Sequence, residues 1–439
     1  MIVALPFFVA EAIDRLEAAG FEAVAVGGCV RDMLAGKTPH DYDIATAATP
    51  DEICAVFSGE RLIETGLKHG TVTVLLSGEP LEITTYRKDG TYSDGRRPDS
   101  VTFSRSLKDD LSRRDFTVNA MAFSPRRGVT DLFGGQADLK AGILRCVGEP
   151  RVRFSEDALR VLRGLRFASQ HGFSIEEKTA AAMNAMRDAL SPVSAERIYA
   201  EMTAMLCGRD VTRVLLAFPE IVCAVLPELK DAVGFSQNNR HHLYTVYSHI
   251  ARVVGAVPAT PALRWAALLH DCGKPACATV DAAGESHFHG HPQESAKRAD
   301  AVLSRLRADN RTKETVLELI ELHDLRTPPT ERAVKRLLSK VGEERFFELC
   351  DLATADRLAQ NPVFFASSKT REDAVRDLAK KLLSEKPCLA VTDLAVSGDD
   401  LLKAGIPAGK ELGDTLRRLL DFVLDGDCEN TKEDLLKRI

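Results

Sequence analysis

The spacing of apolar residues along the chain changes once, near residue 145. Before this point, short apolar runs such as "AVAVGG", "DYDIA", "GTVTVLL" and "LEITTYR" have the length and alternation typical of strands, and helical spacing lies between them. We therefore expect residues 1–145 to form a small α/β head with a mixed sheet, which gives the chain as a whole an α+β fold.

After residue 145, apolar positions recur at helical spacing as far as the C-terminus. We predict a helical neck at 146–207, a helical body at 208–365 and a helical tail at 366–439. The stretch "GEPRVRFS" at 148–155 is a candidate hinge. Residues 87–107 are polar and rich in turn formers, which predicts a functional or mobile loop.

Composition limits the classes of protein that need to be considered. The chain has 439 residues, 45% of them hydrophobic and 28% charged, as expected for a globular protein of several compact units. Its ten cysteines form no C-x-x-C pair, so we expect reduced thiols in a cytoplasmic protein. The apolar start has no basic leader, and we expect neither a signal peptide nor a membrane span. A net charge of −6 means that a nucleic-acid ligand would need a local basic track.

The segment "GGCVRDMLAGKTPHDYDIA" contains the first candidate site. Gly27 and Gly28 would let the backbone approach a phosphate, which Arg31 would neutralise. Asp41 and Asp43 share one face of an extended segment, and two close carboxylates favour a cation between them. Mg²⁺ prefers carboxylate and phosphate oxygens, so the segment predicts a catalytic magnesium site. The alternative is an edge strand with solvated aspartates.

Two further segments add charged residues to this head. Glu82 in "LEITTYR" is a candidate third catalytic carboxylate, and a cross-strand partner for an arginine is an equally good interpretation. In "LSRRDFTVNAMAF" we expect Arg113 and Arg114 to bind phosphate while Asp115 orients a guanidinium, beside a strand that ends at Asn119.

The segment "SEDALRVLRGLRFA" predicts an amphipathic helix that begins with Ser155 as its N-cap. One half of its surface carries Asp157, Arg160, Arg163 and Arg166. Asp157 only accepts hydrogen bonds and Arg160 only donates them. Cytosine and adenine present an amino donor beside a ring-nitrogen acceptor, whereas uracil and guanine present the reverse, so this pair would favour CTP and ATP. The alternative is a solvated charged face.

The order of these motifs resembles the class II tRNA nucleotidyltransferase and bacterial poly(A) polymerase family. The motifs are G-G-x-x-R-D, D-x-D, R-R-D-F-T-x-N-A, "DLFGGQADL" at 131–139, and "EDALRVLR". The resemblance implies template-independent addition of nucleotides to an RNA 3′ end. It also implies that Asp41 and Asp43 hold catalytic Mg²⁺ and that Gly28 and Arg31 contact the triphosphate.

The same resemblance assigns roles on the predicted helix. The positions matching Asp157 and Arg160 replace a nucleic-acid template, and those matching Arg163 and Arg166 lie near the phosphates. Three features favour CCA addition to tRNA over polyadenylation: the segment "RLIETGLKHGTVTV", an acidic C-terminal stretch, and the long polar loop at 87–107. Poly(A) or A-only addition stays an alternative, and a non-catalytic tRNA-binding protein is a third. We expect tRNA, ATP and CTP as partners and no membrane.

The helical body contains a second candidate site. His249, the doublet His270-Asp271 in "LRWAALLHDCGKP", and Asp356 resemble the pattern of HD metal-dependent phosphohydrolases. Such ligands suit Mn²⁺, Ni²⁺, Fe²⁺ or Mg²⁺, and the site could hydrolyse a cyclic phosphate or a phosphomonoester. An HD hydrolase with a nucleotide-docking head is therefore an alternative from another class. The structural alternative is that these residues only brace helices.

Further histidines follow the HD motif. In "HFHGH", His287, His289 and His291 would share a face if this segment were extended, and a solvated loop is the alternative. His291 resembles an accessory position of HD domains, so it is the stronger candidate of the three. His323 in "ELHDL" is open to the same two interpretations.

Overall fold

The structure, a computed structural model, describes residues 5–63, 66–67, 70–90 and 101–439. The chain divides into two compact units, Met1–Pro227 and Glu228–Ile439. The finer division into head, neck, body and tail stays a prediction, and the centre of the predicted loop at 87–107 lies outside the described residues.

The first unit contains the predicted mixed sheet. Its strands follow the order β3-β4-β5-β2-β1-β8-β9, in which β2 and β5 are parallel and every other neighbouring pair is antiparallel. The strands are β1 (Ala23–Val26), β2 (Asp43–Thr46), β3 (Arg61–Ile63), β4 (Thr71–Leu76), β5 (Glu79–Thr85), β8 (Met121–Ser124) and β9 (Gly128–Asp131).

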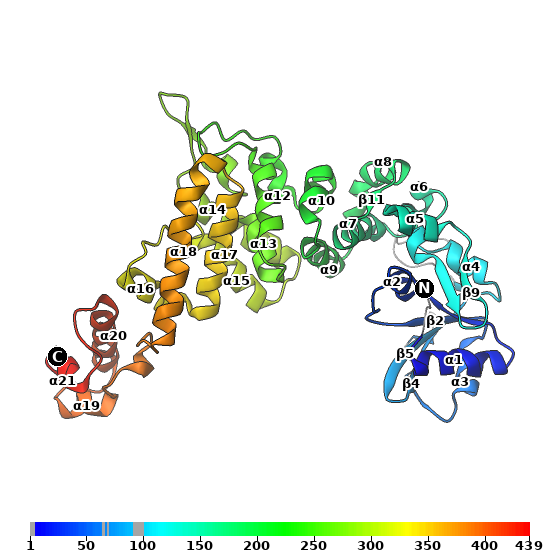
Figure 1. The fold of residues 1–439 in the computed structure, drawn as a ribbon, viewed down its shortest axis with the longest axis horizontal. Helices are drawn as coiled ribbons and strands as arrows, with labels where there is room; N and C mark the ends of the chain where they lie inside the picture. The colour runs from blue at the N-terminus through cyan, green and yellow to red at the C-terminus, as the bar shows by residue number, and fades with distance from the viewer. Residues whose placement is uncertain (1–4, 64–65, 68–69, 91–100) are drawn as a thin grey trace. The chain divides into compact units, whose positions relative to one another are not determined.

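Some strands of the sheet alternate buried and less buried residues, and others are buried throughout. Helices cover the sheet because these apolar faces must be buried. In β4, Val72, Val74 and Leu76 are buried and the residues between them are not. They pack with residues of α1 (Phe7–Ala18) and α3 (Pro50–Val56), which lie along the sheet in Figure 1. Between β1 and β2, α2 (Gly28–Leu34) packs on β1 and β8. The antiparallel pairing of β1 with β2 places the end of β1 beside the start of β2.

Helices and short strands complete the first unit. They are β6 (Arg87–Asp89) paired with β7 (Val101–Phe103), α4 (Leu107–Ser112), α5 (Gly135–Ala141), β10 (Ile143–Leu144) paired with β11 (Ser174–Ile175), α6 (Pro150–Glu156), α7 (Leu159–His171), α8 (Glu177–Ala185), α9 (Ala195–Leu206), α10 (Val211–Ala217) and α11 (Pro219–Val225). The prediction of one helix beginning at Ser155 was wrong. Ser155 lies inside α6, and Asp157 is extended, with φ −142°. Pro150 begins α6, so the candidate hinge at 148–155 is largely helical.

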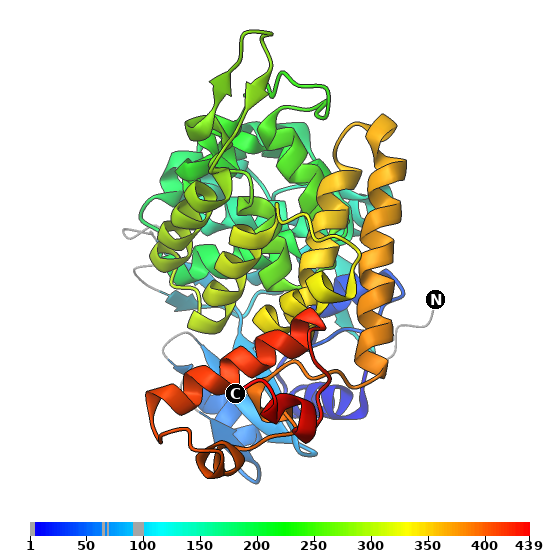
Figure 2. The ribbon, with the colours of Figure 1, turned by 90° about the vertical axis from the view of Figure 1, so that its left-hand side faces the viewer.

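The second unit is built of helices. They are α12 (Val246–Ala256), α13 (Pro261–Leu269), α14 (His291–Arg305), α15 (Asn310–Leu322), α16 (Glu331–Val341), α17 (Glu343–Leu358), α18 (Pro362–Ser384), α19 (Gly398–Lys403), α20 (Lys410–Asp425) and α21 (Lys432–Leu436). A small hairpin of β12 (Thr279–Val280) and β13 (Ser286–His287) projects beyond these helices in Figure 2. All ten cysteines are free thiols. Among the described residues, no helix has the length and apolar character needed to cross a bilayer.

Candidate active site and a histidine-rich pocket

A pocket of about 540 Å³ opens in the first unit where the end of β1, the start of β2 and the face of α7 meet. Every nucleotide-binding residue predicted from the sequence lines it, together with both aspartates of the predicted metal site. The residues concerned are Gly27, Gly28, Arg31, Asp41, Asp43, Arg113, Arg114, Asp157, Arg160, Arg163 and Arg166. Asp115, Asn119, Leu159, Phe167 and Arg197 also line the pocket. Glu82 does not.

The glycines bring backbone and arginine side chains close together. Gly27 has φ +80°, and a Cβ there would lie 2.9 Å from Nη1 of Arg114, so this position requires glycine. Arg31 is buried, and its guanidinium donates to Asp32 at 2.9 and 3.0 Å and to Oδ1 of Asn119 at 2.6 Å. These hydrogen bonds fix the orientation of Arg31 at the pocket wall, where its positive charge could bind an anionic ligand.

Both paired aspartates line the pocket, although only Asp43 belongs to a strand. Asp43 begins β2, and Asp41 precedes it by two residues. Asp43 is exposed at the pocket, and partial desolvation by the surrounding protein raises its pKa. The negative charges of Asp41 and Glu82 raise this pKa further, and the positive charge of Arg114 opposes them. Glu82 faces Asp43 in register across the parallel pair β2–β5. Such crowded carboxylates fit a divalent cation, because a cation would relieve their repulsion.

A buried aspartate that the sequence analysis did not single out positions the two neighbouring arginines. Asp110 on α4 is fully buried and accepts hydrogen bonds from Arg113 at 3.0 and 2.6 Å and from Arg114 at 3.1 Å. Burial acts to raise the pKa of Asp110, but the two arginines outweigh it and the pKa is lowered. Its spacing of three and four residues from the arginines is the signal that could have identified it.

Asp115 orients a guanidinium, as predicted. The guanidinium is that of Arg163 on α7. Arg163 donates to Asp115 Oδ2 at 2.8 and 2.6 Å, and Asn119 donates to the other oxygen at 3.1 Å. Burial acts to raise the pKa of Asp115, but the charge of Arg163 outweighs it and lowers the pKa to about 2. Asn119 lies in a 3₁₀ turn, Thr117–Asn119, before β8; the expectation that it ends a strand was wrong.

The two predicted base-reading residues have protein partners in this structure. Asp157 accepts from Nη2 of Arg197 at 2.7 Å and from the backbone N–H of Leu159 at 3.0 Å. Arg160 donates to Glu156 at 2.5 Å and to the backbone carbonyls of Arg153 and Arg113, both at 3.0 Å. A base that binds these side chains must therefore replace existing hydrogen bonds.

The helix α9 supports this face of the pocket. It provides Arg197, the partner of Asp157, and Glu201, which accepts a hydrogen bond from Arg166 at 2.7 Å. Neither residue belongs to a motif described above. Their partners lie on a different element, so no local spacing in the sequence links them. Their own spacing of four residues places them on one face of α9.

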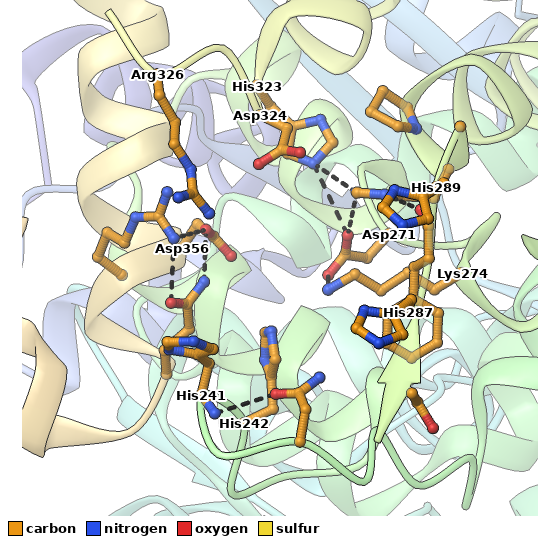
Figure 3. A pocket seen from close by; sticks show the side chains of 18 of the residues that line it. His241, His242, Asp271, Lys274, His287, His289, His323, Asp324, Arg326 and Asp356 are labelled. Carbon is orange, nitrogen blue, oxygen red and sulfur yellow. Dashed lines mark hydrogen bonds and ion pairs between the residues drawn. The ribbon is translucent and has the colours of Figure 1, made fainter. Parts of the chain in front are cut away.

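A second pocket, of about 650 Å³, lies in the helical unit. Figure 3 shows Asp271 in the middle of this pocket and Asp356 across from it. The four residues predicted from the HD-like pattern come together: His249 on α12, His270 and Asp271 after α13, and Asp356 on α17. His249 Nε2 lies 2.9 Å from Asp356 Oδ1 and 3.3 Å from Asp271 Oδ2, and His270 Nε2 lies 3.2 Å from Asp271 Oδ2.

The charges of this cluster favour a cation. Burial acts to lower the pKa of His270, but the charge of Asp271 outweighs it and raises the pKa to about 10. Burial acts in the opposite sense on Asp271 and Asp356, yet the neighbouring histidines lower the pKa of both carboxyls. Asp271 is buried and Asp356 half-buried, so two ionised carboxylates converge with two imidazoles in a ligand set that could hold a metal ion.

The other histidines divide into two groups. His287 and His289 stack with ring centroids 5.8 Å apart, and His287 pairs with Asp281 at 2.8 Å. His291 begins α14, so the three histidines do not lie on one extended face. His291 instead joins His323 and Asp271 in a second group of clustered ligand atoms. The sequence alone does not decide between the two interpretations of His323.

Comparison with known proteins identifies the family. Family models match three segments: the poly(A) polymerase head domain at residues 23–145, the RNA- and SrmB-binding site of polymerase A at 172–232, and tRNA nucleotidyltransferase domain 2 at 291–439. The chain is 35% identical over 429 residues to a CCA-adding enzyme of Enterococcus faecalis, covering 97% of this chain and 94% of that protein. The chain belongs to the CCA-adding enzyme family.

Other relatives agree with this membership. A CCA-adding enzyme of Lactobacillus delbrueckii subsp. bulgaricus is 34% identical over 427 residues, covering 96% of this chain and 94% of that protein. The crystal structure of the Bacillus stearothermophilus CCA-adding enzyme in complex with CTP has a TM-score of 0.72 and 28% identity, covering 98% of this chain and 95% of that one. The family resemblance inferred from the motifs and the α+β fold class are therefore confirmed. Nucleotidyltransferases of this family use divalent metals.

Proposed function

We propose that this protein adds the sequence CCA to tRNA 3′ ends, using CTP and ATP and no nucleic-acid template. The observation that carries the proposal is that one pocket contains the paired carboxylates Asp41 and Asp43, the arginines suited to a triphosphate, and the donor–acceptor pair of Asp157 and Arg160. The relatives named CCA-adding enzymes support it. A cytoplasmic location is part of the proposal, as expected for an enzyme that processes tRNA.

The residues of the pocket have distinct tasks in this reaction. Asp41 and Asp43 would hold Mg²⁺, which supplies Lewis-acid activation of the reacting oxygens when bound. Arg31, held by Asp32 and Asn119, binds the triphosphate and orients it. A bond forms between the RNA 3′-oxygen and the α-phosphorus, the bond between the α-phosphorus and its bridging oxygen breaks, and pyrophosphate and a proton leave. Glu82 makes no contact with the nucleotide in this proposal. Its negative charge instead raises the pKa of Asp43.

Base selection uses the hydrogen bonds that Asp157 and Arg160 exchange. In the structure, Asp157 accepts a hydrogen bond from Arg197, and Arg160 donates one to Glu156. CTP or ATP replaces both partners with an amino donor for Asp157 and a ring-nitrogen acceptor for Arg160. UTP and GTP present a carbonyl and an N–H in the reverse order, which leaves both side chains unpaired and costs affinity.

A direct assay tests CCA addition against its alternatives. Purified protein receives tRNA lacking CCA, tRNA ending in CC, or an unrelated RNA, each with one labelled nucleotide. We expect CMP on the first RNA, one AMP on the second and almost none on the third. Long A-tracts on the unrelated RNA would instead indicate a poly(A) polymerase. AMP without CMP incorporation would indicate an A-adding enzyme.

A second activity is favoured by the histidine cluster of the helical unit. We propose that His249, His270, Asp271 and Asp356 hold a divalent metal and that the pocket hydrolyses phosphate esters, with water adding to phosphorus and the alcohol leaving. The supporting observation is their convergence at 2.9–3.3 Å. The test is hydrolysis of p-nitrophenyl phosphate with Mn²⁺ or Ni²⁺: His270→Ala should lose it, and Asp41→Ala should keep it. Hydrolysis unaffected by His270→Ala would contradict this second function.

A further inference from the structure

One aromatic ring in the first unit contacts three of the arginines that line its pocket. Phe167 on α7 lines the same pocket and is 5% exposed. The Cζ atoms of Arg166, Arg163 and Arg31 lie 4.3, 5.3 and 5.4 Å from the centre of its ring. All three distances are within the roughly 6 Å over which a cation is attracted to an aromatic face. The ring is therefore a common contact for three positive charges.

The three arginines reach the ring from two helices. Arg163 and Arg166 lie on α7 with Phe167, and Arg31 comes from α2. Each guanidinium also donates to a carboxylate. The acceptors are Asp32 for Arg31, Asp115 for Arg163 and Glu201 for Arg166. The carboxylates and the ring together determine where the guanidiniums point.

Three converging guanidiniums repel one another when no anion is bound. The effect is visible at Arg166, whose pKa is lowered by burial and by the charge of Arg163, against the charge of Glu201. The face of a phenyl ring is electronegative, so it attracts the guanidiniums. A further carboxylate at this position would attract them as well, but its net charge would repel a phosphate. A phenyl ring has no net charge and avoids that cost.

The other neighbours of the ring are uncharged. Phe116 meets it edge to face, with centroids 5.9 Å apart, and His171 stacks with it at 6.0 Å. Burial, followed by the charge of Arg31, lowers the pKa of His171 to about 4, so this imidazole is neutral at neutral pH. His171 and Phe116 therefore fix the ring without adding positive charge to the pocket.

We propose that Phe167 is a positioning residue, whose ring holds Arg31, Arg163 and Arg166 in the arrangement that binds the triphosphate. This role rests on the nucleotide addition proposed above and deepens it. All nucleoside triphosphates share the phosphates, so loss of the ring should weaken CTP, ATP and UTP by the same factor. Base selection, which depends on Asp157 and Arg160, should not change.

The first experiment measures binding of sodium tripolyphosphate to the full-length protein by isothermal titration calorimetry, with a chelator present to exclude divalent metals. Phe167→Leu keeps an apolar side chain but removes the ring, and Kd should rise about tenfold. Phe167→Tyr keeps the ring and should stay within about twofold of wild type. Replacement of Phe167 by pentafluorophenylalanine keeps the shape and reverses the charge distribution of the ring, so it should weaken binding about as much as leucine does.

A double-mutant cycle tests whether Phe167 acts through its arginine neighbours. Arg166→Ala alone should also weaken tripolyphosphate binding. If the ring acts through Arg166, the double variant should lose clearly less than the product of the two single losses. Fully multiplicative losses at Arg166, and likewise at Arg163 and Arg31, would overturn the proposal.

Phe173→Leu is the matched control, since Phe173 stacks on the same His171 but is not among the residues that line the pocket. This control should bind tripolyphosphate as wild type does, and thermal melting checks that each variant is folded. If Phe167→Leu fails to fold, the fluorinated protein decides the matter. Wild-type affinity in the fluorinated protein would overturn the proposal, and so would a wild-type protein that does not bind tripolyphosphate.

The second experiment measures kcat/KM for CTP and UTP in Phe167→Leu. Both values should fall by the same factor, which leaves their ratio at its wild-type value. A changed ratio would overturn the assignment of Phe167 to the triphosphate. If no protein adds CMP to tRNA while the differences in tripolyphosphate binding appear as expected, the proposed CCA addition fails and the role of Phe167 in anion binding stands.

Discussion

The pocket of the first unit and the pocket of the helical unit have comparable volumes, about 540 and 650 Å³, but different arrangements of charge. In the first unit, Asp41 and Asp43 lie among seven pocket-lining arginines. In the helical unit, one buried carboxylate lies at the centre and imidazoles surround it. The first arrangement suits an anionic polyphosphate whose phosphate oxygens would complete the coordination of the metal ion. The second can hold metal ions with protein atoms alone.

The same difference appears in the two kinds of histidine. His171, at the end of α7, has its pKa lowered to about 4, first by burial and then by the charge of Arg31. His270 has its pKa raised to about 10, because the charge of Asp271 outweighs burial. Burial and the charge of Arg31 thus disfavour a positive charge at His171 in the first unit, whereas Asp271 favours one at His270 in the helical unit.

Exchange of metal ions should separate the two pockets most strongly. Removing divalent metals with a chelator should abolish nucleotide addition and phosphate-ester hydrolysis alike. Mg²⁺ should restore addition, because the head offers carboxylate and phosphate oxygens. Hydrolysis should require Mn²⁺ or Ni²⁺, which bind imidazole well. Assays of both activities over a series of metals test this, and an identical metal preference for both would contradict the comparison.

Substitution of Arg160 should have the next largest effect. Arg160→Ala removes the donor for the ring nitrogen of cytosine or adenine, so discrimination against UTP should fall by about 10–100-fold. Arg153→Ala is the matched control, since Arg153 pairs with the same Glu156 but does not line the pocket. Measuring kcat/KM for CTP and UTP tests this. Unchanged selectivity in Arg160→Ala would remove Arg160 from base recognition.

The smallest expected effect is on stability and involves His171. Because its pKa is about 4 in the folded protein and about 6.5 when unfolded, the unfolded state binds a proton first as the pH falls. The stabilisation is present above pH 6.5 and is lost towards pH 4, with roughly 1–2 kcal/mol lost between pH 7 and pH 5. Urea unfolding at both values should show a smaller loss for His171→Phe, which keeps the stacking with Phe167 and Phe173. An equal loss would contradict the pKa assignment.

The residues of the head pocket were predictable because the motifs are local in sequence. Local spacing shows which way side chains point without knowledge of the fold. The examples are a glycine pair that ends a strand, an i,i+2 pair of aspartates, and arginines spaced along one helix. The break of the helix at Asp157 was missed, since Ser155 is an equally good N-cap by residue type alone. The mixed sheet was expected, but its strand order depends on pairings between distant segments, which no local pattern specifies.

The partners of these residues were largely unpredictable, because they come from other elements. Glu201 and Arg197 reach the pocket from α9, which packs on α7. The second ligand group of the helical unit likewise joins His291 and His323 from separate helices to Asp271. Such groups depend on helix packing, which short sequence patterns do not encode. Asp110 is the exception, since its helical spacing from Arg113 and Arg114 is visible in the sequence.

The central claim is that the paired carboxylates of the head carry out nucleotide addition. The most direct measurement is single-turnover incorporation of labelled CMP into tRNA lacking CCA, by the wild-type protein and by Asp43→Ala. Loss of several kcal/mol of charge stabilisation predicts a decrease in rate on the order of a thousandfold. tRNA binding and phosphate-ester hydrolysis should stay unchanged. Incorporation at the wild-type rate by Asp43→Ala would contradict the account.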